Sequence, residues 1–332
     1  MTRVLVTREL PGGSGDGSPI ARLRDALGPE NVDLWPDFDP PTAEAFLART
    51  EGCDGILCMI TDRIDAAFLD ARPTVRAVAQ LAVGYDNIDV PACTERGVLV
   101  TNTPDVLSDA TADMAWALLM AAARRLPAGR DAIEQGRWGQ WNPTWMLSSE
   151  VTGRTLGILG PGRIGAAAAK RASGFEMTVL YTGRREKPGF PGTFVPLEEL
   201  LARSDFISVH VPLTDETRGM CDAAFFRRMQ PHAIFVNTSR GPVVDQSALI
   251  AALEDGTIAA AGLDVMTPEP LPPDDPLVRA PNIVLSPHVG SATLETRTKM
   301  AHLAVDGLLA GLRGERVRHL VNPDALNAAS RR

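Results

Sequence analysis

Three charged or titratable residues in the second half of the chain have types that suit binding of an anion and acid–base chemistry. Arg240 follows an apolar run and precedes Gly241, and its guanidinium could hold a carboxylate or polarise a keto oxygen. His288 lies where another apolar run turns into a loop, and imidazole can give a proton at neutral pH to the alkoxide that hydride transfer creates. Glu269, set between two prolines, could accept a hydrogen bond from the other ring nitrogen and keep the imidazole protonated.

Each of these residues also fits an ordinary role when taken alone: a surface arginine, a loop carboxylate, or a histidine that only supports the fold. Their positions favour a shared role, because each follows a predicted strand and a doubly wound sheet presents its strand ends to a ligand. We therefore treat Arg240, Glu269 and His288 as one candidate catalytic set.

The segment Gly160-Pro-Gly-Arg-Ile-Gly165 has the spacing of a dinucleotide site and directly follows the apolar run 155–159. The first glycine permits a tight turn, the second lets the backbone approach a pyrophosphate, and the third allows close packing of the alanine-rich helix that follows. A glycine-rich turn without a ligand is the alternative, but the order strand, motif, helix and strand favours a dinucleotide. The predicted contacts are Gly160, Gly162, Arg163, Ile164 and Gly165.

The loop at residues 181–187 bears on the choice of cofactor. An enzyme that uses NAD usually carries an acidic residue about twenty residues beyond the motif, where it binds the ribose 2′-hydroxyl. This chain has Thr182, Arg184 and Arg185 there instead, and these could donate hydrogen bonds to a 2′-phosphate. The residue types therefore favour NADP(H). NAD(H) stays possible if the segment is only a solvated basic loop beside a site that takes either cofactor.

Short β-branched runs alternate with helical stretches along the chain, a pattern typical of a mostly parallel α/β sheet. The first predicted strands are 3–7, 32–35, 55–59, 75–81 and 98–101, with helices at 20–27, 43–49, 65–71 and 108–125. The segment 138–145 is rich in tryptophan and predicted to be irregular. A second series of strands is predicted at 155–159, 177–181, 206–211, 233–237, 259–263 and 283–286, and a last helix, 294–312, could pack back on the first domain.

Length and composition indicate a folded, enzyme-sized protein with two domains. At 332 residues the chain exceeds the size at which a single core usually keeps growing. The net charge of −8 argues against nucleic-acid or anionic-membrane binding, because both need clustered cations. The four cysteines show no CxxC pair and no metal-ligand spacing, so we expect reduced, buried thiols and no metal.

The apolar runs of the sequence do not indicate secretion or a membrane span. The run at the N-terminus is too short for a signal peptide. The longest run, 114–123, covers half a membrane span and is expected to form a buried helix. We therefore expect a soluble, cytoplasmic protein.

Ordered motifs from residue 81 to residue 293 resemble the D-specific 2-hydroxyacid dehydrogenase family. Besides the glycine motif they are Leu81-Ala-Val-Gly-Tyr-Asp-Asn-Ile-Asp89, His210-Val-Pro-Leu213 with Thr217, Asn237-Thr-Ser-Arg-Gly241, Ala261-Gly-Leu-Asp-Val265, Pro268-Glu-Pro270 and Ser286-Pro-His-Val-Gly-Ser-Ala-Thr293. The resemblance implies an α/β fold with two doubly wound parallel sheets. In it a Rossmann-type cofactor domain, 103–289, is inserted in a flavodoxin-like substrate domain, 1–102 and 290–332, with the catalytic site in a cleft that closes and excludes water.

The resemblance also implies a role for each site residue. Arg240 would bind the substrate carboxylate or carbonyl, Glu269 would support the histidine, and His288 would be the proton donor. The backbone amides of Val83 and Gly84 would hold the substrate carboxylate. Asp264 would lie near the nicotinamide amide, and further cofactor contacts are implied at Pro212, Thr217, Thr238 and Gly290.

Within the family, the sequence is similar to the glyoxylate/hydroxypyruvate reductases through 103–107, the tryptophan-rich segment, 180–184 and 268–272. This branch implies NADPH-dependent reduction of a small 2-keto acid, glyoxylate or hydroxypyruvate, to the D-2-hydroxy acid. It also implies a homodimer in which a tryptophan, here Trp141, reaches toward the partner's active site. Packing of all three tryptophans in the core of the dimer is the alternative.

Two other functions stay open at this point. A NAD-dependent relative that acts on another 2-hydroxy acid or on phosphite would share the same catalytic set. A nicotinamide-sensing binding protein without useful turnover is the second, although an intact set argues against it. The chain is too short at its C-terminus for the regulatory domain of some phosphoglycerate dehydrogenases, which disfavours that assignment. The sequence does not rank glyoxylate against hydroxypyruvate or pyruvate, since pocket differences of one methylene contribute only about 1–3 kcal/mol.

Overall fold

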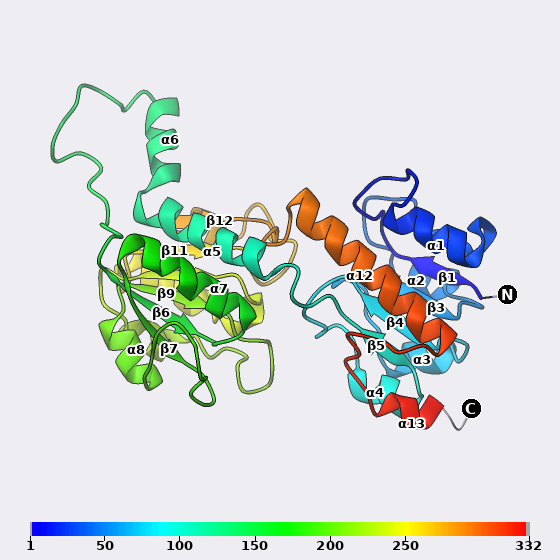
Figure 1. Ribbon diagram of the computed structural model, residues 1–332. Coiled ribbons are helices and arrows are strands. Elements are labelled where there is room, and N and C mark those ends of the chain that lie inside the picture. The colour runs from blue at the N-terminus through cyan, green and yellow to red at the C-terminus, as the bar shows by residue number, and fades with distance from the viewer. Residues whose placement is uncertain (1, 330–332) are drawn as a thin grey trace. The chain divides into compact units, whose positions relative to one another are not determined.

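The computed structural model describes residues 2–329, and the chain forms two compact units (Figure 1). The first unit contains the residues up to Leu107 and those from Ala292 onward, and the second is the continuous stretch Ser108–Ser291. Each unit has its own parallel sheet and its own hydrophobic core. The predicted class, α/β with two doubly wound parallel sheets, is confirmed.

The five strands of the first unit lie in the order β2-β1-β3-β4-β5, all parallel. They are β1 Val4–Val6, β2 Val32–Leu34, β3 Gly55–Cys58, β4 Ala77–Gln80 and β5 Leu99–Thr101. Every residue of β1, β3, β4 and β5 is buried, because the crossover helices of a parallel sheet cover both of its faces. The order is that of flavodoxin-like sheets.

Helix α12, Leu294–Arg313, covers one face of this sheet. It begins after Thr293, whose hydroxyl accepts the amide of Thr296 at 3.1 Å and so satisfies a free helix donor. It contacts β3, β4 and β5 and buries Ala301 and Leu308 completely. The other helices of the unit are α1 Pro19–Leu27, η1 Pro29–Asn31, α2 Ala43–Arg49, α3 Ala66–Ala71, α4 Val90–Glu95 and α13 Ala325–Ala329.

The second unit has a seven-stranded parallel sheet in the order β12-β11-β10-β9-β6-β7-β8. Its strands are β6 Thr155–Leu159, β7 Thr178–Thr182, β8 Thr193–Phe194, β9 Phe206–Val209, β10 Ile234–Asn237, β11 Ala260–Leu263 and β12 Ile283–Leu285. The strand order reverses between β6 and β9. Doubly wound sheets bind ligands outside the carboxyl ends of the strands at such a point.

Helix α5, Ser108–Ala123, is buried in the second unit against α7, β10, β11 and β12. The indole nitrogen of Trp116 donates to the carbonyl of Ala168 at 2.9 Å, and the run 114–123 forms a buried helix as predicted. No helix in the described part of the chain is long and apolar enough to cross a membrane. The other helices are α6 Leu126–Glu134, α7 Arg163–Arg171, η2 Ala172–Phe175, α8 Leu197–Arg203, α9 Ala223–Arg228, η3 Gly241–Val243, α10 Gln246–Glu254 and α11 Pro276–Arg279.

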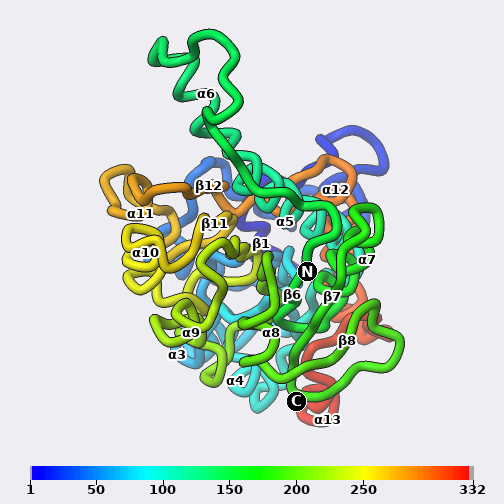
Figure 2. Tube along the Cα trace, turned by 90° about the vertical axis from the view of Figure 1, so that its left-hand side faces the viewer, coloured from blue at the N-terminus to red at the C-terminus, as the bar shows by residue number. Residues whose placement is uncertain are grey.

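Residues 126–147, which we call the projecting segment, extend away from the sheet of the second unit in both views (Figures 1 and 2). The predicted helix 108–125 instead ends at Ala123, because Arg125 adopts a left-handed φ of 51° and the chain restarts as α6. Helix α6 was not predicted: its large apolar side chains, Leu126 and Ile133, are exposed, and Ala132 is its only buried residue. The exposed large apolar side chains of the segment are Leu126, Ile133, Trp138, Trp141, Trp145 and Leu147.

Candidate active site

Arg240, Glu269 and His288 follow three neighbouring parallel strands of the second unit, β10, β11 and β12. The carboxyl ends of these strands share one edge of the sheet, so the loops that carry the three residues are adjacent. His288 Nδ1 lies 2.7 Å from Glu269 Oε2, and both side chains are about one-third exposed, at 28% and 33%. The structure therefore contains a histidine–carboxylate pair that is both held and accessible.

Glu269 is held in this pair by a second contact. Its Oε1 accepts the backbone amide of Met266 at 3.0 Å. Burial alone would raise the pKa of Glu269, but the hydrogen bond and charge of His288, the Met266 amide and the charge of Arg240 outweigh it and hold the pKa below its ordinary value. The side chain is therefore a carboxylate at neutral pH, and it favours a proton on the ring nitrogen that it faces.

The loop that carries Arg240 packs tightly against the loop that carries Glu269. A Cβ built on Gly241 would lie 1.8 Å from the carbonyl oxygen of Met266, so only glycine allows this approach. Asn237, the last residue of β10, donates from its amide to the carbonyl of Arg240 at 3.0 Å and accepts the amide of Ser239 at 2.9 Å. Together these contacts fix the backbone of Arg240 and of the residues before and after it.

Asp264 is 1% exposed and organises the loop after β12. Its two carboxylate oxygens accept the backbone amides of Val289 at 2.9 Å and Gly290 at 2.7 Å. A Cβ on Gly290 would lie 2.9 Å from Asp264 Oδ2, so glycine permits this contact. The structure thus places Asp264 and Gly290 beside His288, as a fixed support for the loop that carries the imidazole.

The glycine motif has room for a pyrophosphate where a dinucleotide site needs it. A Cβ built on Gly162 at the start of α7 would have no atom within 4 Å, and no side chain caps this helix N-terminus. The first amides of the helix are thus available to an anion, which the helix dipole attracts. Gly160 has a φ of 101°, and a Cβ on Gly165 would lie 2.3 Å from the Gly160 carbonyl oxygen. The backbone fits a dinucleotide.

The loop after β7 lies beside this motif. The amide of Gly160 donates to the carbonyl of Thr182, which is buried, at 3.1 Å. Arg184 and Arg185 are exposed and have no hydrogen-bond or ion-pair partner among the described residues. Lys187, which no sequence pattern indicated, donates from its ammonium to the carbonyl of Pro161 at 2.8 Å and so connects the two loops.

Two further predicted cofactor contacts, Thr217 and Thr238, differ in how their hydroxyls are used within the chain. The hydroxyl of Thr217 donates to the carbonyl of Pro212 at 2.6 Å and accepts the amide of Thr214 at 2.8 Å, so it closes its own loop. Thr238 is buried at the end of β10, and its hydroxyl has no partner among the described residues. His210, the first residue of the motif His210-Val-Pro-Leu213, directly follows β9, and burial lowers its pKa to about 4.

The remaining predicted residues lie elsewhere in the chain. Val83 and Gly84 belong to the first unit, in the loop that follows β4. Trp141 is 86% exposed in the projecting segment and makes no hydrogen bond or ring contact with a described residue. The contacts within this chain therefore give Trp141 no role.

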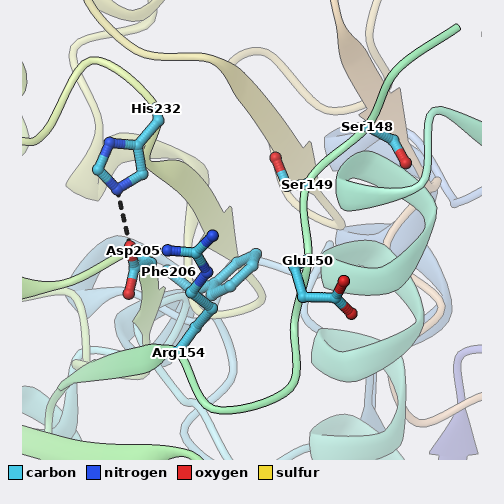
Figure 3. A pocket seen from close by; sticks show the side chains of 7 residues that line it. All are labelled: Ser148, Ser149, Glu150, Arg154, Asp205, Phe206 and His232. Atoms are coloured by element: carbon cyan, nitrogen blue, oxygen red, sulfur yellow. Dashed lines mark hydrogen bonds and ion pairs between the residues drawn. The ribbon is translucent and has the colours of Figure 1, made fainter. Parts of the chain in front are cut away.

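A cavity of about 370 Å³ lies at the opposite edge of the sheet in the second unit (Figure 3). Arg154 and Phe206, which line it, lie where β6 and β9 begin, whereas the glycine motif follows the end of β6. His232 Nε2 is 2.7 Å from Asp205 Oδ1, and the other oxygen of Asp205 accepts the amide of Thr155 at 2.8 Å. The cavity lies where these strands begin and the candidate active site lies at the carboxyl ends of the strands, so the two are separate.

All four cysteines are buried and free, and burial raises the pKa of Cys93 to about 12. Within the described residues, no group of three or more His, Cys, Asp or Glu side chains could hold a metal ion.

Comparison with known proteins agrees with this geometry. Residues 116–290 match the family described as D-isomer specific 2-hydroxyacid dehydrogenase, NAD binding domain. The chain is 49% identical over 329 residues to a glyoxylate reductase of Korarchaeum cryptofilum, covering 98% of this chain and 97% of that protein.

Solved structures of similar proteins share the fold of this chain over nearly its full length. The TT0316 protein from Thermus thermophilus has a TM-score of 0.87 at 43% identity, with 96% of this chain and 100% of that chain covered. The NADPH-dependent glyoxylate/hydroxypyruvate reductase of Sinorhizobium meliloti, in complex with NADP and malonate, has a TM-score of 0.82 at 34% identity, with 98% and 97% covered.

The fold, the site and these similarities identify the chain as an NAD(P)-dependent dehydrogenase with a Rossmann-type domain. The chain belongs to the D-isomer specific 2-hydroxyacid dehydrogenase family, as its ordered motifs predicted. It therefore interconverts a 2-hydroxy acid and the matching 2-keto acid.

Proposed function

We propose that the protein reduces glyoxylate or hydroxypyruvate with NADPH and releases the D-2-hydroxy acid. The observation that carries the proposal is the 2.7 Å contact between His288 and Glu269 on the sheet edge that also carries Arg240. The names of the similar proteins, glyoxylate reductase and NADPH-dependent glyoxylate/hydroxypyruvate reductase, support the choice of substrate and cofactor.

His288 supplies the proton in this reaction. The Glu269 carboxylate accepts from Nδ1, so Nε2 is left to hold a proton toward the oxygen of the keto group. When bound, the reduced nicotinamide supplies the hydride to the keto carbon. The charged imidazole neutralises the oxygen as negative charge develops on it and then gives up its proton, which leaves the ring neutral; Glu269 stabilises the positive charge that the ring carries before this transfer.

Arg240 and the loop after β4 hold the substrate. The guanidinium of Arg240 binds the carboxylate or polarises the keto oxygen. The backbone amides of Val83 and Gly84 bind the carboxylate, and within the described residues these two amides have no protein partner. In this proposal the first unit is the substrate domain and the second binds the cofactor, with boundaries near residues 102 and 290.

The second unit contains the residues that would hold the cofactor. Gly160, Gly162, Arg163, Ile164 and Gly165 would hold the pyrophosphate at the start of α7. Thr182, Arg184 and Arg185 bind the 2′-phosphate, which gives NADP(H) its preference over NAD(H). Asp264 lies near the carboxamide, and the other contacts are Pro212, Thr217, Thr238 and Gly290.

The protein works as a homodimer in the cytoplasm in this proposal. The exposed apolar side chains of the projecting segment would be buried by a second copy, and Trp141 would reach toward the partner's site. Sedimentation should show a dimer for the wild type and a weaker one for a variant with alanine at all three tryptophans of the segment. Single replacement of Trp141 should raise KM for the keto acid while the dimer persists. A monomeric wild type would remove this part of the proposal.

One experiment tests the whole assignment. Turnover is measured with a panel of 2-keto acids, each with NADPH and with NADH. The proposal expects the highest kcat/KM for glyoxylate or hydroxypyruvate with NADPH. If a larger keto acid were the best substrate, the assignment of glyoxylate or hydroxypyruvate would be wrong. A clear preference for NADH would contradict the proposed 2′-phosphate site. Cofactor binding without any turnover would favour a sensing protein.

A further inference from the structure

In the loop after β4, the backbone carbonyls of residues 82–84 accept hydrogen bonds from the protein, whereas the backbone amides of residues 83–85 donate none to the part of the chain that the structure describes. The carbonyl of Ala82 accepts the amide of Thr103 at 2.9 Å, the carbonyl of Val83 accepts the side chain of Asn102 at 2.8 Å, and the carbonyl of Gly84 accepts the side chain of Gln80 at 3.2 Å. Each of three successive carbonyls is therefore held by the protein.

The amides of the same loop make no such bonds. Within the described residues, the backbone N–H groups of Val83, Gly84 and Tyr85 have no hydrogen-bond acceptor. These peptide bonds are trans, so each N–H points away from the carbonyl of its own peptide plane. Holding the carbonyls of 82, 83 and 84 thus fixes the direction of the N–H groups of 83, 84 and 85. N–H groups that are held in fixed directions and have no internal acceptor can donate charge-assisted hydrogen bonds to an anion.

Gln80 controls the third of these planes. It is fully buried as the last residue of β4. Its Nε2 donates to the Gly84 carbonyl and to Asn87 Oδ1 at 2.8 Å, and its Oε1 accepts the thiol of Cys58 at 3.1 Å. Both donors and the acceptor are used, and a buried amide costs stability when it is left unpaired.

Asn87 holds the Gln80 side chain in place and joins it to a different part of the unit. Its Nδ2 donates to the carbonyls of Met59 at 3.0 Å and Asp62 at 2.7 Å, in the loop after β3. The orientation of the Gly84–Tyr85 plane is therefore set by a chain of contacts from β3 through Asn87 and Gln80.

We propose that Gln80 is a positioning residue: by holding the Gly84 carbonyl it directs the amide of Tyr85 as a third donor beside the Val83 and Gly84 amides, to which the proposed function already assigns the substrate carboxylate. The proposal rests on the proposed function, which places the substrate carboxylate at this loop. Charge-assisted bonds from three fixed amides are made equally in the ground state and in the transition state. Their loss therefore raises KM and leaves kcat nearly unchanged.

The test uses Gln80→Met, which keeps the length of the side chain and removes its polar atoms. We expect KM for the keto acid to rise about tenfold and kcat to change less than about threefold. Calorimetry with oxalate, an unreactive dicarboxylate, in the presence of NADP(H) should show a similar rise in Kd. NADPH affinity of the free enzyme should stay as in the wild type.

Asn322→Leu is the matched control. Asn322 is a buried amide in the same unit, 4% exposed, and its bonds go to Val98, Val100 and Thr94 rather than to the loop. It should lower Tm about as much as Gln80→Met without changing oxalate affinity. If Gln80→Met does not fold, Asn87→Ala removes the oxygen that holds the Gln80 amide and should raise KM in the same direction.

The outcomes separate the two proposals. Unchanged oxalate affinity and KM in a folded Gln80→Met or Asn87→Ala enzyme would overturn the role of Gln80 and leave the proposed function intact. If Asn322→Leu weakened oxalate binding as much as Gln80→Met, the effect would come from general destabilisation, and the role of Gln80 would also be overturned. A wild type that binds neither oxalate nor a keto acid would overturn the proposed function together with this inference.

Discussion

The backbone nitrogen of His288 lies 2.8 Å from the carbonyl oxygen of Asp264. His288 also has a left-handed φ of 53°, which is uncommon for a residue other than glycine and must be imposed by its surroundings. Asp264 imposes it from both sides, because its carboxylate holds the next two amides. The orientation of the imidazole therefore depends on a buried aspartate, Asp264, that does not contact the ring.

Replacement of Asp264 by asparagine should disturb this loop. The asparagine nitrogen cannot accept a hydrogen bond, so one of the amides of Val289 and Gly290 loses its acceptor, at a cost of about 1–3 kcal/mol. We expect a lower Tm and a lower kcat, measured by thermal unfolding and steady-state kinetics. Asp245→Asn is the control, since Asp245 caps α10 through one amide and asparagine caps helices equally well. Equal effects in both variants would contradict the role of Asp264.

Replacement of His288 by glutamine should remove the proton donor while leaving the cofactor site intact. We expect kcat to fall roughly 10²-fold or more. NADPH affinity, followed by fluorescence titration, should stay near the wild-type value. A variant with near-normal turnover would exclude His288 as the general acid.

Glu269 should make the stability of the enzyme depend on acid pH. Its pKa is lower in the folded protein than in the unfolded chain, so between the two pKa values the unfolded chain binds more protons. The stabilisation is present above the ordinary glutamate pKa of about 4.3 and is lost as pH falls through the folded value. Denaturant unfolding of wild type and Glu269→Gln should therefore differ in the slope of stability against pH below that point. Parallel curves would argue against the shift.

The two arginines after β7 should set the cofactor preference. Changing both Arg184 and Arg185 to alanine should raise KM for NADPH by about tenfold or more, because a 2′-phosphate loses its charged donors. KM for NADH should change little. Arg227→Ala, an exposed arginine on α9 of the same unit, is the control and should change neither value. Equal losses with both cofactors would place the arginines outside the 2′-phosphate site.

Gly241→Ala should separate the loops that carry Arg240 and Glu269. The added methyl group would overlap the Met266 carbonyl, a clash of the kind that costs about 1–3 kcal/mol or more. We expect a lower Tm together with a loss of activity. Gly174→Ala adds a methyl group in open space in η2 of the same unit and should change neither. Full activity in Gly241→Ala would show that the loops tolerate displacement.

The fold class could be predicted because strand and helix patterns in this chain are strong and local. Runs such as 155–159 are apolar and bounded by turn residues, and β6 begins and ends at these residues. Helix α6 could not be predicted in the same way. Its large apolar side chains, Leu126 and Ile133, face solvent in this chain and only Ala132 is buried, so the helix lacks the stripe of large apolar residues that marks a core-facing helix.

The candidate site was only partly accessible from the sequence. Residue types and the strand ends pointed to Arg240, Glu269 and His288, and the structure adds the hydrogen bond between the last two. Contacts between loops carry no sequence signal, so the bond from Lys187 to Pro161 was missed. Gln80 and Asn87 were missed for the same reason, since isolated amides in an α/β protein mark no chemistry until their partners are known.

The arrangement of the first unit has a consequence for how the protein is made. Its strands lie in the first part of the chain, but α12, which covers one face of β3, β4 and β5, is synthesised only after the whole second unit. The second unit is continuous and can fold on the ribosome as it emerges, because domains generally fold as units during synthesis. Until α12 arrives, the nascent first sheet carries an uncovered apolar face, so we expect chaperones to bind the growing chain during this interval.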